Sequence, residues 1–305
     1  MSHALSYPIA SQNALIYVRL TMVAFLWGGT FVAGRIVSGE MSPLVAAMVR
    51  FGLATLVLLF LVWKTEGGLP RLTWRQSVLM GLLGLSGVCL YNLFFFAALT
   101  EMPASRTALF VACNPIAVAL AGGLIAWRLL PIGQVVGICV ALAGAVIVIS
   151  GGDVAGLMTD LQQSFGRGEL FMLAAVGSWV GYTLLGRKAL GSLSPLAAAT
   201  WAALFGSMLL ALGLPLAGTA QVLQLPTFTC TLAIIYLVIG GTVVPFVWYY
   251  SGVRTLGPER TAVFTNLVPV FGVALGATIL HEPVGASMLI GGTLVIAGVT
   301  LANRG

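Results

Sequence analysis

Long apolar runs limit the fold of this sequence more than any other feature. A helix that crosses a membrane needs about 20 predominantly apolar residues. Breaking the chain at charges, prolines and glycine clusters leaves ten runs near that length, at 14–37, 43–63, 77–99, 104–127, 131–150, 169–187, 194–215, 228–252, 260–280 and 283–302. Because the runs are apolar throughout, without an alternating polar face, they favour helices over a membrane barrel. The sequence therefore predicts an all-α polytopic membrane protein with ten transmembrane helices.

The composition excludes most soluble classes of protein. Charged residues make up only 7% of the chain, against roughly one quarter in soluble domains. The 14 lysines and arginines are too dispersed to form a basic face for nucleic acid. The four cysteines lie in apolar runs, where we expect small buried side chains rather than disulfides or a metal site; they are Cys89, Cys113, Cys139 and Cys230. We expect no cofactor.

The positions of lysine and arginine predict the orientation of the chain. Cytoplasmic loops of membrane proteins are enriched in these residues. With a cytoplasmic N-terminus, ten of them fall on the inner side and three, Arg35, Arg106 and Arg167, on the outer side. Both termini are therefore expected in the cytoplasm.

The two halves of the chain resemble each other. At an offset of 152 residues the matching pairs are Trp27 with Trp179, Gly34-Arg35 with Gly186-Arg187, and Ser42-Pro43-Leu44 with Ser194-Pro195-Leu196. At an offset of 154 they are Arg106-Thr107-Ala108-Leu109-Phe110 with Arg260-Thr261-Ala262-Val263-Phe264, Pro115 with Pro269, and Gly137 and Gly144 with Gly291 and Gly298. A slip of two residues in a loop explains the change of offset. A string this specific indicates an internal duplication.

Five crossings per half is an odd number, so the second copy must enter the membrane from the opposite side. We expect a first five-helix repeat at 1–150, an extracytoplasmic linker at 151–168 and a second, inverted five-helix repeat at 169–305. Many secondary transporters are built from inverted repeats, with the substrate site near the midplane between them. The predicted architecture therefore favours transport.

Three motifs resemble the EamA-type drug/metabolite transporter superfamily. They are Trp27-Gly28-Gly29-Thr30-Phe31, the two Arg-Thr-Ala-x-Phe segments at Arg106 and Arg260, and His281-Glu282-Pro283. The resemblance covers nearly the whole chain, which looks most like the YddG-type bacterial exporters of aromatic and other neutral amino acids. It implies an integral protein of the bacterial inner membrane, with a central cavity lined by the first, third, fourth, sixth, eighth and ninth helices. Many members carry a Glu where the first half here reads Arg128-Leu129-Leu130-Pro131, so we assign Glu282 no direct transport role.

Deep aromatic residues are the first candidates for a substrate site. A cavity walled by rings would suit a flat apolar side chain, and residues four apart, such as Tyr91 and Phe95, share one helix face. The candidates are Trp27, Tyr91, Phe95, Trp179, Tyr182, Trp248 and Tyr249. Large side chains also fill space between helices, so core packing stays an alternative for each ring.

Polar residues at depth are further candidates. Arg50 lies in the run 43–63, where a charge near mid-bilayer costs at least roughly 2.5 kcal/mol. Its long side chain could reach outward to the membrane surface, or it could face a wet cavity and hold a carboxylate. Asn92, Asn114 and Asn266 could bind the ammonium or carboxylate of an amino acid, and hydrogen bonding between helices is the alternative.

Three prolines inside the runs are hinge candidates. Pro115 and Pro269 each follow the repeated arginine by nine residues, which is about 13 Å along a helix. Proline removes a backbone hydrogen bond and permits a kink. Pro245 is a third candidate. A fixed kink that only shapes the bundle is the alternative for all three.

The missing groups also inform the mechanism. No Asp or Glu lies deep in a run and both histidines lie near termini or run ends, so a proton relay has no obvious carrier. No phosphate-binding loop for ATP is present. We therefore expect a facilitative exporter of small amphipathic metabolites, and not an enzyme; proton-coupled efflux of drugs or other metabolites is the alternative. The expected partners are a small-molecule substrate and the lipid bilayer, with no ATPase subunit, and a monomer is compatible with this.

Overall fold

The computed structural model is helical in every regular element that it describes. It describes residues 9–125, 131–150, 152–153, 166–189, 193–217, 225–256, 261 and 264–302. Within these residues, seven helical segments are long and apolar enough to cross a membrane: Leu15–Ser38, Pro43–Glu66, Trp74–Glu101, Ala104–Leu124, Arg167–Gly186, Pro195–Gly213 and Phe228–Tyr249. Three shorter apolar helices lie at Ile132–Val148, Phe264–Ile279 and Ala286–Gly298. The all-helical membrane architecture is confirmed, and the count of ten crossings stays a prediction.

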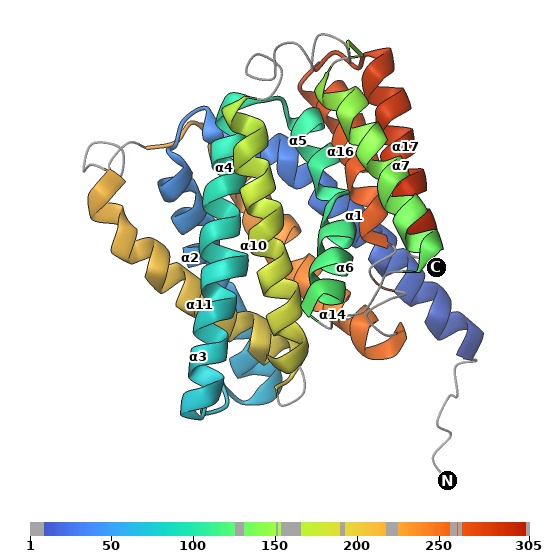
Figure 1. Ribbon diagram of the computed structural model, residues 1–305. Coiled ribbons are helices and arrows are strands. Elements are labelled where there is room, and N and C mark those ends of the chain that lie inside the picture. The colour runs from blue at the N-terminus through green and yellow to red at the C-terminus, as the bar shows by residue number, and fades with distance from the viewer. Residues whose placement is uncertain are drawn as a thin grey trace.

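The helices begin and end close to the predicted runs (Figure 1). The first half contains α1 (Ile9–Ser38), α2 (Pro43–Glu66), α3 (Trp74–Leu83), η1 (Gly84–Leu90), α4 (Tyr91–Glu101), α5 (Ala104–Val111), α6 (Asn114–Ile125) and α7 (Ile132–Ile149). The second half contains α10 (Arg167–Ala189), α11 (Pro195–Gly213), η2 (Leu214–Ala217), α13 (Phe228–Val238), η3 (Ile239–Val243), α14 (Val244–Leu256), η4 (Phe264–Leu267), α16 (Val268–Ile279) and α17 (Ala286–Ala302). Most of the predicted linker 151–168 lies outside the described residues, as do Arg128 and Arg260.

The repeated Ser-Pro motif starts a helix in each half. Ser42 is the N-cap of α2 and Ser194 is the N-cap of α11, and in both cases proline follows in the first turn. The Ser194 hydroxyl accepts a hydrogen bond from the backbone N–H of Ala197 at 3.0 Å. Proline suits this place because its missing N–H would have no partner inside the helix. A short local motif therefore sets two helix starts.

Two transmembrane helices contain π-helical segments. The segment η1 lies between α3 and α4, and η3 lies between α13 and α14. The backbone N–H of Tyr91 bonds to the carbonyl of Ser86, and that of Val244 bonds to the carbonyl of Ile239, both five residues back. Such segments leave neighbouring carbonyls without their usual donors and often occur at functional sites. These two therefore direct attention to the third and eighth predicted crossings.

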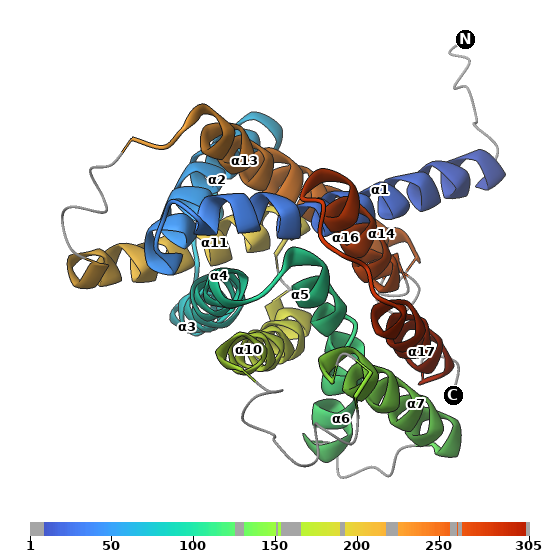
Figure 2. The same cartoon turned by 90° about the horizontal axis from the view of Figure 1, so that it is seen from above.

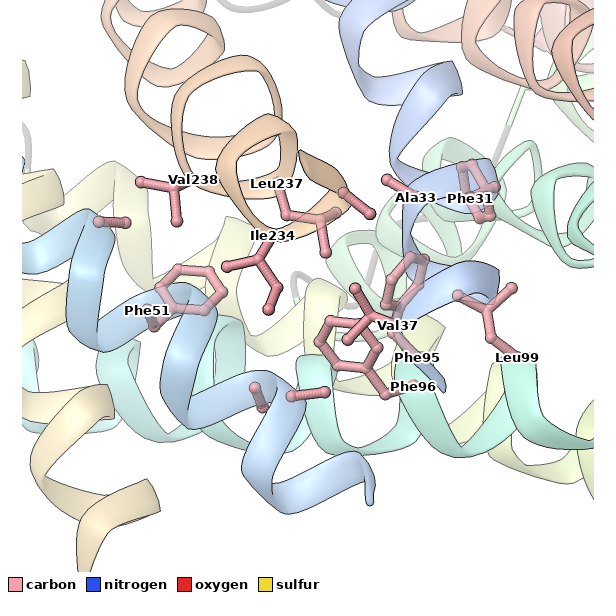
Figure 3. Close-up of a cluster of buried hydrophobic side chains, with 14 of the residues drawn as sticks. Phe31, Ala33, Val37, Phe51, Phe95, Phe96, Leu99, Ile234, Leu237 and Val238 are labelled. Carbon is pink, nitrogen blue, oxygen red and sulfur yellow. The ribbon is translucent and has the colours of Figure 1, made fainter. Parts of the chain in front are cut away.

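The largest buried apolar cluster joins α1, α2, α4 and α13 (Figure 3). Its large side chains include Phe31, Val37, Phe51, Phe95, Phe96, Leu99 and Leu237, each no more than 3% exposed. Elements from both halves of the chain thus share one core. This core holds α1 and α4 in a fixed register beside the aromatic residues described below.

The helices α7 and α17 lie side by side, as both ribbon views show (Figures 1 and 2). A Cβ at Gly144 would lie 2.5 Å from the carbonyl oxygen of Gly291, and one at Gly291 would lie 2.6 Å from that of Gly144. A Cβ at Gly298 would lie 2.6 Å from the carbonyl oxygen of Gly137. Because these distances exclude any side chain, the glycines allow the two backbones to touch.

Two of the three prolines are not kinks inside a helix. The fourth predicted crossing breaks after α5, and Pro115 lies in the first turn of the new helix α6. Pro269 likewise lies in the first turn of α16, after the 3-10 turn η4. Their missing N–H groups therefore remove no interior hydrogen bond. Pro245 differs, because it lies at the start of α14 within the unbroken segment Phe228–Tyr249.

One cysteine departs from the expectation of burial. All four are free, and Cys89 and Cys230 are buried while Cys113 is half-buried. Cys139 is exposed on α7. A small, weakly polar thiol suits an outward helix face in a membrane as well as a core, so this correction leaves the fold unchanged.

Candidate functional site

Trp27 is the centre of an aromatic cluster. Its ring lies 6.5 Å from the Trp179 ring, in an edge-to-face arrangement with an angle of 83° between the planes. The Tyr249 ring is 5.2 Å from it and the Phe246 ring is 6.2 Å from it, measured between centroids. The cluster therefore joins α1, α10 and α14.

The cluster continues from Trp179 into α4. The Trp179 ring lies 5.2 Å from that of Tyr91 and 5.3 Å from that of Tyr182. Tyr91 stacks on Phe95 at 6.1 Å, and Phe95 lies 5.3 Å from Phe31 of α1. Six of the seven predicted aromatic candidates thus form one connected group drawn from four predicted crossings.

Trp248 does not join this group. It is half-buried on α14 and makes no ring contact within the described part of the chain. Phe246, Phe31 and Phe96 do join it, the last by a 5.2 Å contact with Phe95, and the sequence analysis missed all three. Helical spacing could have found two of them, since Phe31 follows Trp27 by four residues and Phe246 precedes Tyr249 by three.

A narrow hollow borders the cluster on one side of Trp27. It is lined by Leu20, Val23, Ala24, Trp27, Tyr249, Phe264 and Thr265. The space is too narrow for a water molecule. The ring distances given above show that the rings contact one another in this conformation.

Arg50 is buried rather than extended to the membrane surface. It is 6% exposed. Its Nη1 donates to Oδ1 of Asn92 at 3.1 Å, and its Nε donates to Oγ1 of Thr242 at 3.2 Å. Its Nη2 donates to the carbonyl oxygen of Gly241 at 3.2 Å. The guanidinium thus links α2 to α4 and to η3, and the outward-reaching alternative is excluded.

The residues around Gly241 explain why its carbonyl is available to Arg50. Pro245 has no N–H, so it cannot donate to the carbonyl of Gly241 four residues back. That carbonyl accepts from Arg50 instead. A Cβ at Gly241 would lie 2.8 Å from Cγ2 of Thr30 and 3.3 Å from Nη2 of Arg50, so a glycine is needed for the close approach.

Asn92 and Thr242 also bond to their own helices at the π-helical segments. Nδ2 of Asn92 donates to the carbonyl of Val88 at 2.9 Å and more weakly to that of Gly87 at 3.4 Å. Oγ1 of Thr242 donates to the carbonyl of Leu237 at 3.0 Å. These side chains satisfy carbonyls within η1 and near the end of α13, the helix before η3. The network around Arg50 therefore connects both segments.

Asn114 and Asn266 lie at the breaks in the fourth and ninth predicted crossings. Asn114 begins α6 and is 7% exposed, while Asn266 lies in η4 and is 6% exposed. Among the residues that the structure describes, Oδ1 of Asn114 and both amide atoms of Asn266 have no hydrogen-bond partner. Buried amides of this kind are costly unless something pairs with them, so both positions can receive a polar ligand group.

Charged contacts gather at the predicted outer ends of the helices. Arg106 forms an ion pair with Glu169, with 2.7 Å between Nη2 and Oε1. Glu169 is 5% exposed and lies in the first turn of α10. A buried acidic residue is therefore present at the end of one predicted crossing. Glu282 accepts hydrogen bonds from the backbone N–H groups of Ala104 and Ser105, both at 2.8 Å. Glu282 therefore caps α5, which gives it a structural role.

The site as a whole offers aromatic faces beside a buried cation and amide groups. Such a combination can bind a small molecule that has a flat apolar part and a polar end. Among the described residues, no group of three or more His, Cys, Asp or Glu side chains could hold a metal ion.

The fold and the site define a polytopic membrane transporter, and the family comparison agrees. The model of the EamA-like transporter family matches residues 15–150 and 166–304, so the chain belongs to this family. The match falls on the two halves separately. Together with the apolar helices and relatives in bacterial inner membranes, this makes the chain an integral inner-membrane protein.

Several relatives are similar over almost their whole length. The uncharacterized transporter YyaM of Bacillus subtilis is 28% identical over 94% of this chain and 93% of its own. The probable amino-acid metabolite efflux pump of Salmonella typhimurium is 26% identical over 91% of each chain. The uncharacterized inner membrane transporter YedA of Escherichia coli is 24% identical over 95% of this chain and 91% of its own.

A solved crystal structure of another protein has the same fold. It aligns with a TM-score of 0.66 and 21% sequence identity, over 95% of this chain and 97% of the other. The likeness supports the helical arrangement described above.

Proposed function

We propose that this protein exports small amphipathic metabolites, above all neutral and aromatic amino acids, by alternating access. The aromatic cluster around Trp27 carries the proposal, because it brings rings from four predicted crossings beside the buried Arg50 network. The similarity to a probable amino-acid metabolite efflux pump supports the substrate class. The aromatic faces bind the side chain, and the Arg50 network and the two amides of Asn114 and Asn266 bind the polar end.

The proposed mechanism depends on two inverted five-helix repeats, 1–150 and 169–305, with both termini in the cytoplasm. Contacts between residues at matching positions support this arrangement. Trp27 contacts Trp179, and Thr55 shares a hydrogen bond of 3.0 Å with Ser207; both pairs are separated by the 152-residue offset. Matching residues meet only near the axis that relates two copies. The glycine contacts between α7 and α17 are exchanged symmetrically: Gly144 meets Gly291, the match of Gly137, and Gly137 meets Gly298, the match of Gly144.

The proposed transport is facilitative. Among the described residues, the candidate site contains one charged group, the Arg50 guanidinium, and no carboxylate contacts it. The buried Glu169 favours proton antiport as a second candidate, because it is an acid inside a helix. Glu169 is already held in an ion pair with Arg106, with 2.7 Å between Nη2 and Oε1.

Counterflow in liposomes tests the proposal. Purified protein is reconstituted with unlabelled Trp, Phe, Thr or Met inside, and uptake of the labelled amino acid is followed with and without a pH gradient. We expect saturable exchange that the gradient does not change. Exchange that requires the gradient would replace the facilitative mechanism by antiport, and absence of exchange for all four would overturn the amino-acid class.

A further inference from the structure

Arg50 is a buried cation whose three hydrogen bonds all go to neutral acceptors. These are an amide oxygen of Asn92, the hydroxyl of Thr242 and the carbonyl of Gly241. Among the described residues, no acidic side chain forms an ion pair with it. Burying a charge is costly unless an opposite charge compensates it. The site is therefore electrostatically incomplete without an anion.

The guanidinium also has donors to spare. It carries five N–H groups, and the structure uses three of them. A carboxylate can accept two parallel hydrogen bonds from one guanidinium, and such charge-assisted bonds are roughly twice as strong as neutral ones. An incoming carboxylate could use the two remaining N–H groups, or replace a neutral acceptor.

The Arg50 network lies within about one helical turn of the aromatic cluster on three helices. Asn92 directly follows Tyr91 on α4. Thr242 precedes Phe246 by four residues on the eighth predicted crossing, and Thr30, which borders Gly241, follows Trp27 by three. Three to four residues correspond to about 5 Å along a helix. A carboxylate and a ring separated by a short aliphatic link would fit this spacing.

We propose that Arg50 binds the carboxylate of the substrate and makes a carboxylate a requirement for transport. The inference deepens the proposed function and rests on it for the transported class. The aromatic cluster binds the side chain and Arg50 binds the carboxylate, so the protein selects α-amino acids and related aryl carboxylates over amides and amines of the same shape.

The experiment compares ligands that differ only at the carboxylate. Counterflow is measured with phenylalanine, phenylalaninamide and phenethylamine. Equilibrium binding of phenylacetate and phenylacetamide to the detergent-solubilised protein is measured by quenching of tryptophan fluorescence. The variants are Arg50→Gln and Arg50→Lys, with Arg75→Gln on the exposed start of α3 as a matched control.

We expect the wild-type protein and Arg75→Gln to prefer each carboxylate by about tenfold or more, as a hydrogen-bonded charge pair provides. Arg50→Gln removes this preference. Arg50→Lys keeps the positive charge but loses the paired hydrogen bonds of the guanidinium, so it keeps only part of the preference for the carboxylate. Equal affinity of the wild-type protein for phenylacetate and phenylacetamide would overturn the inference, and so would a preference that survives in Arg50→Gln.

The two readouts separate the inference from the proposed function. Carboxylate-selective binding without counterflow of any amino acid overturns the proposed function and leaves Arg50 as a carboxylate site. Counterflow of phenylalanine and phenylalaninamide at equal rates overturns the role of Arg50 alone. If Arg50→Gln does not fold, the wild-type selectivity and Arg50→Lys still decide.

Discussion

Trp27 and Trp179 occupy matching positions in the two halves of the chain and meet edge to face, with 6.5 Å between their ring centroids. Each also contacts a tyrosine from a further helix, Tyr249 in one case and Tyr91 in the other. The contact therefore lies at the centre of the proposed substrate site. Any movement of one half relative to the other must change it.

Replacing either tryptophan tests the aromatic cluster as a substrate site. We expect Trp27→Ala and Trp179→Ala each to lower amino-acid counterflow by about tenfold or more, since each loses ring contacts worth roughly 0.5–1.5 kcal/mol per pair as well as apolar contact area. Trp63→Ala is the control, because this residue is 64% exposed on α2. Normal flux in both cluster variants at equal expression would assign the two rings to packing alone.

Much of the fold was predictable because its signals are local. Apolar runs marked the helices, Ser-Pro motifs marked two helix starts, and the matching pairs at two offsets indicated an internal duplication. Helix periodicity would also have found Phe31 and Phe246.

The partners of Arg50 were not predictable, because they lie 42, 191 and 192 residues away in the sequence. Their meeting depends on helix register and on the π-helical segments, for which the sequence carried no distinct local signal. The sequence alone shows that Pro245 lacks an N–H group. It does not show that Arg50 supplies the replacing donor, because Arg50 comes from another helix.

The glycines between α7 and α17 provide a test of helix packing. Gly144→Ala places a Cβ against the backbone of α17, where it would meet the carbonyl oxygen of Gly291 at 2.5 Å. Overpacking of this kind costs about 1–3 kcal/mol, to be measured as the free energy of unfolding in detergent micelles. Gly177→Ala is the matched control, because nothing lies within 4 Å of its added Cβ. Equal stability of the two variants would show that the helices separate easily.

Glu40 provides a test of pH dependence outside the predicted crossings. Hydrogen bonds from the hydroxyl of Thr227, and then from its backbone N–H at 2.9 Å, lower the pKa of Glu40 below 4.5. A lowered folded-state pKa contributes stability at pH values above 4.5 that is lost as the pH falls through the folded-state value. We expect Glu40→Gln to have a lower Tm than the wild-type protein at pH 7, with the difference vanishing under acid conditions. Thr227→Val should lower the Tm at every pH, because the Thr227 hydroxyl also caps α13 by accepting from the backbone N–H of Cys230 at 3.2 Å. A difference between Glu40→Gln and the wild-type protein that grows on acidification would contradict the expected sign.

The contact between Glu282 and Ser105 provides a test of alternating access. Glu282 lies in the loop between α16 and α17, and it caps α5 through the N–H groups of Ala104 and Ser105. If the two halves move apart at this end during transport, the cap must break in each cycle. We therefore expect Ser105→Cys combined with Glu282→Cys, in a background without the four native cysteines, to stop counterflow when oxidised and to recover it when reduced.

The single variants Ser105→Cys and Glu282→Cys serve as controls for this cross-link. Glu282→Cys leaves two N–H groups at the start of α5 without their acceptor, a loss of capping worth roughly 0.5–2 kcal/mol, so its stability is measured beside its flux. Neither single variant should respond to oxidation. Wild-type flux through the fully cross-linked protein would mean that this end of the molecule stays closed throughout the cycle, and the opening would then have to be sought at the opposite ends of the helices.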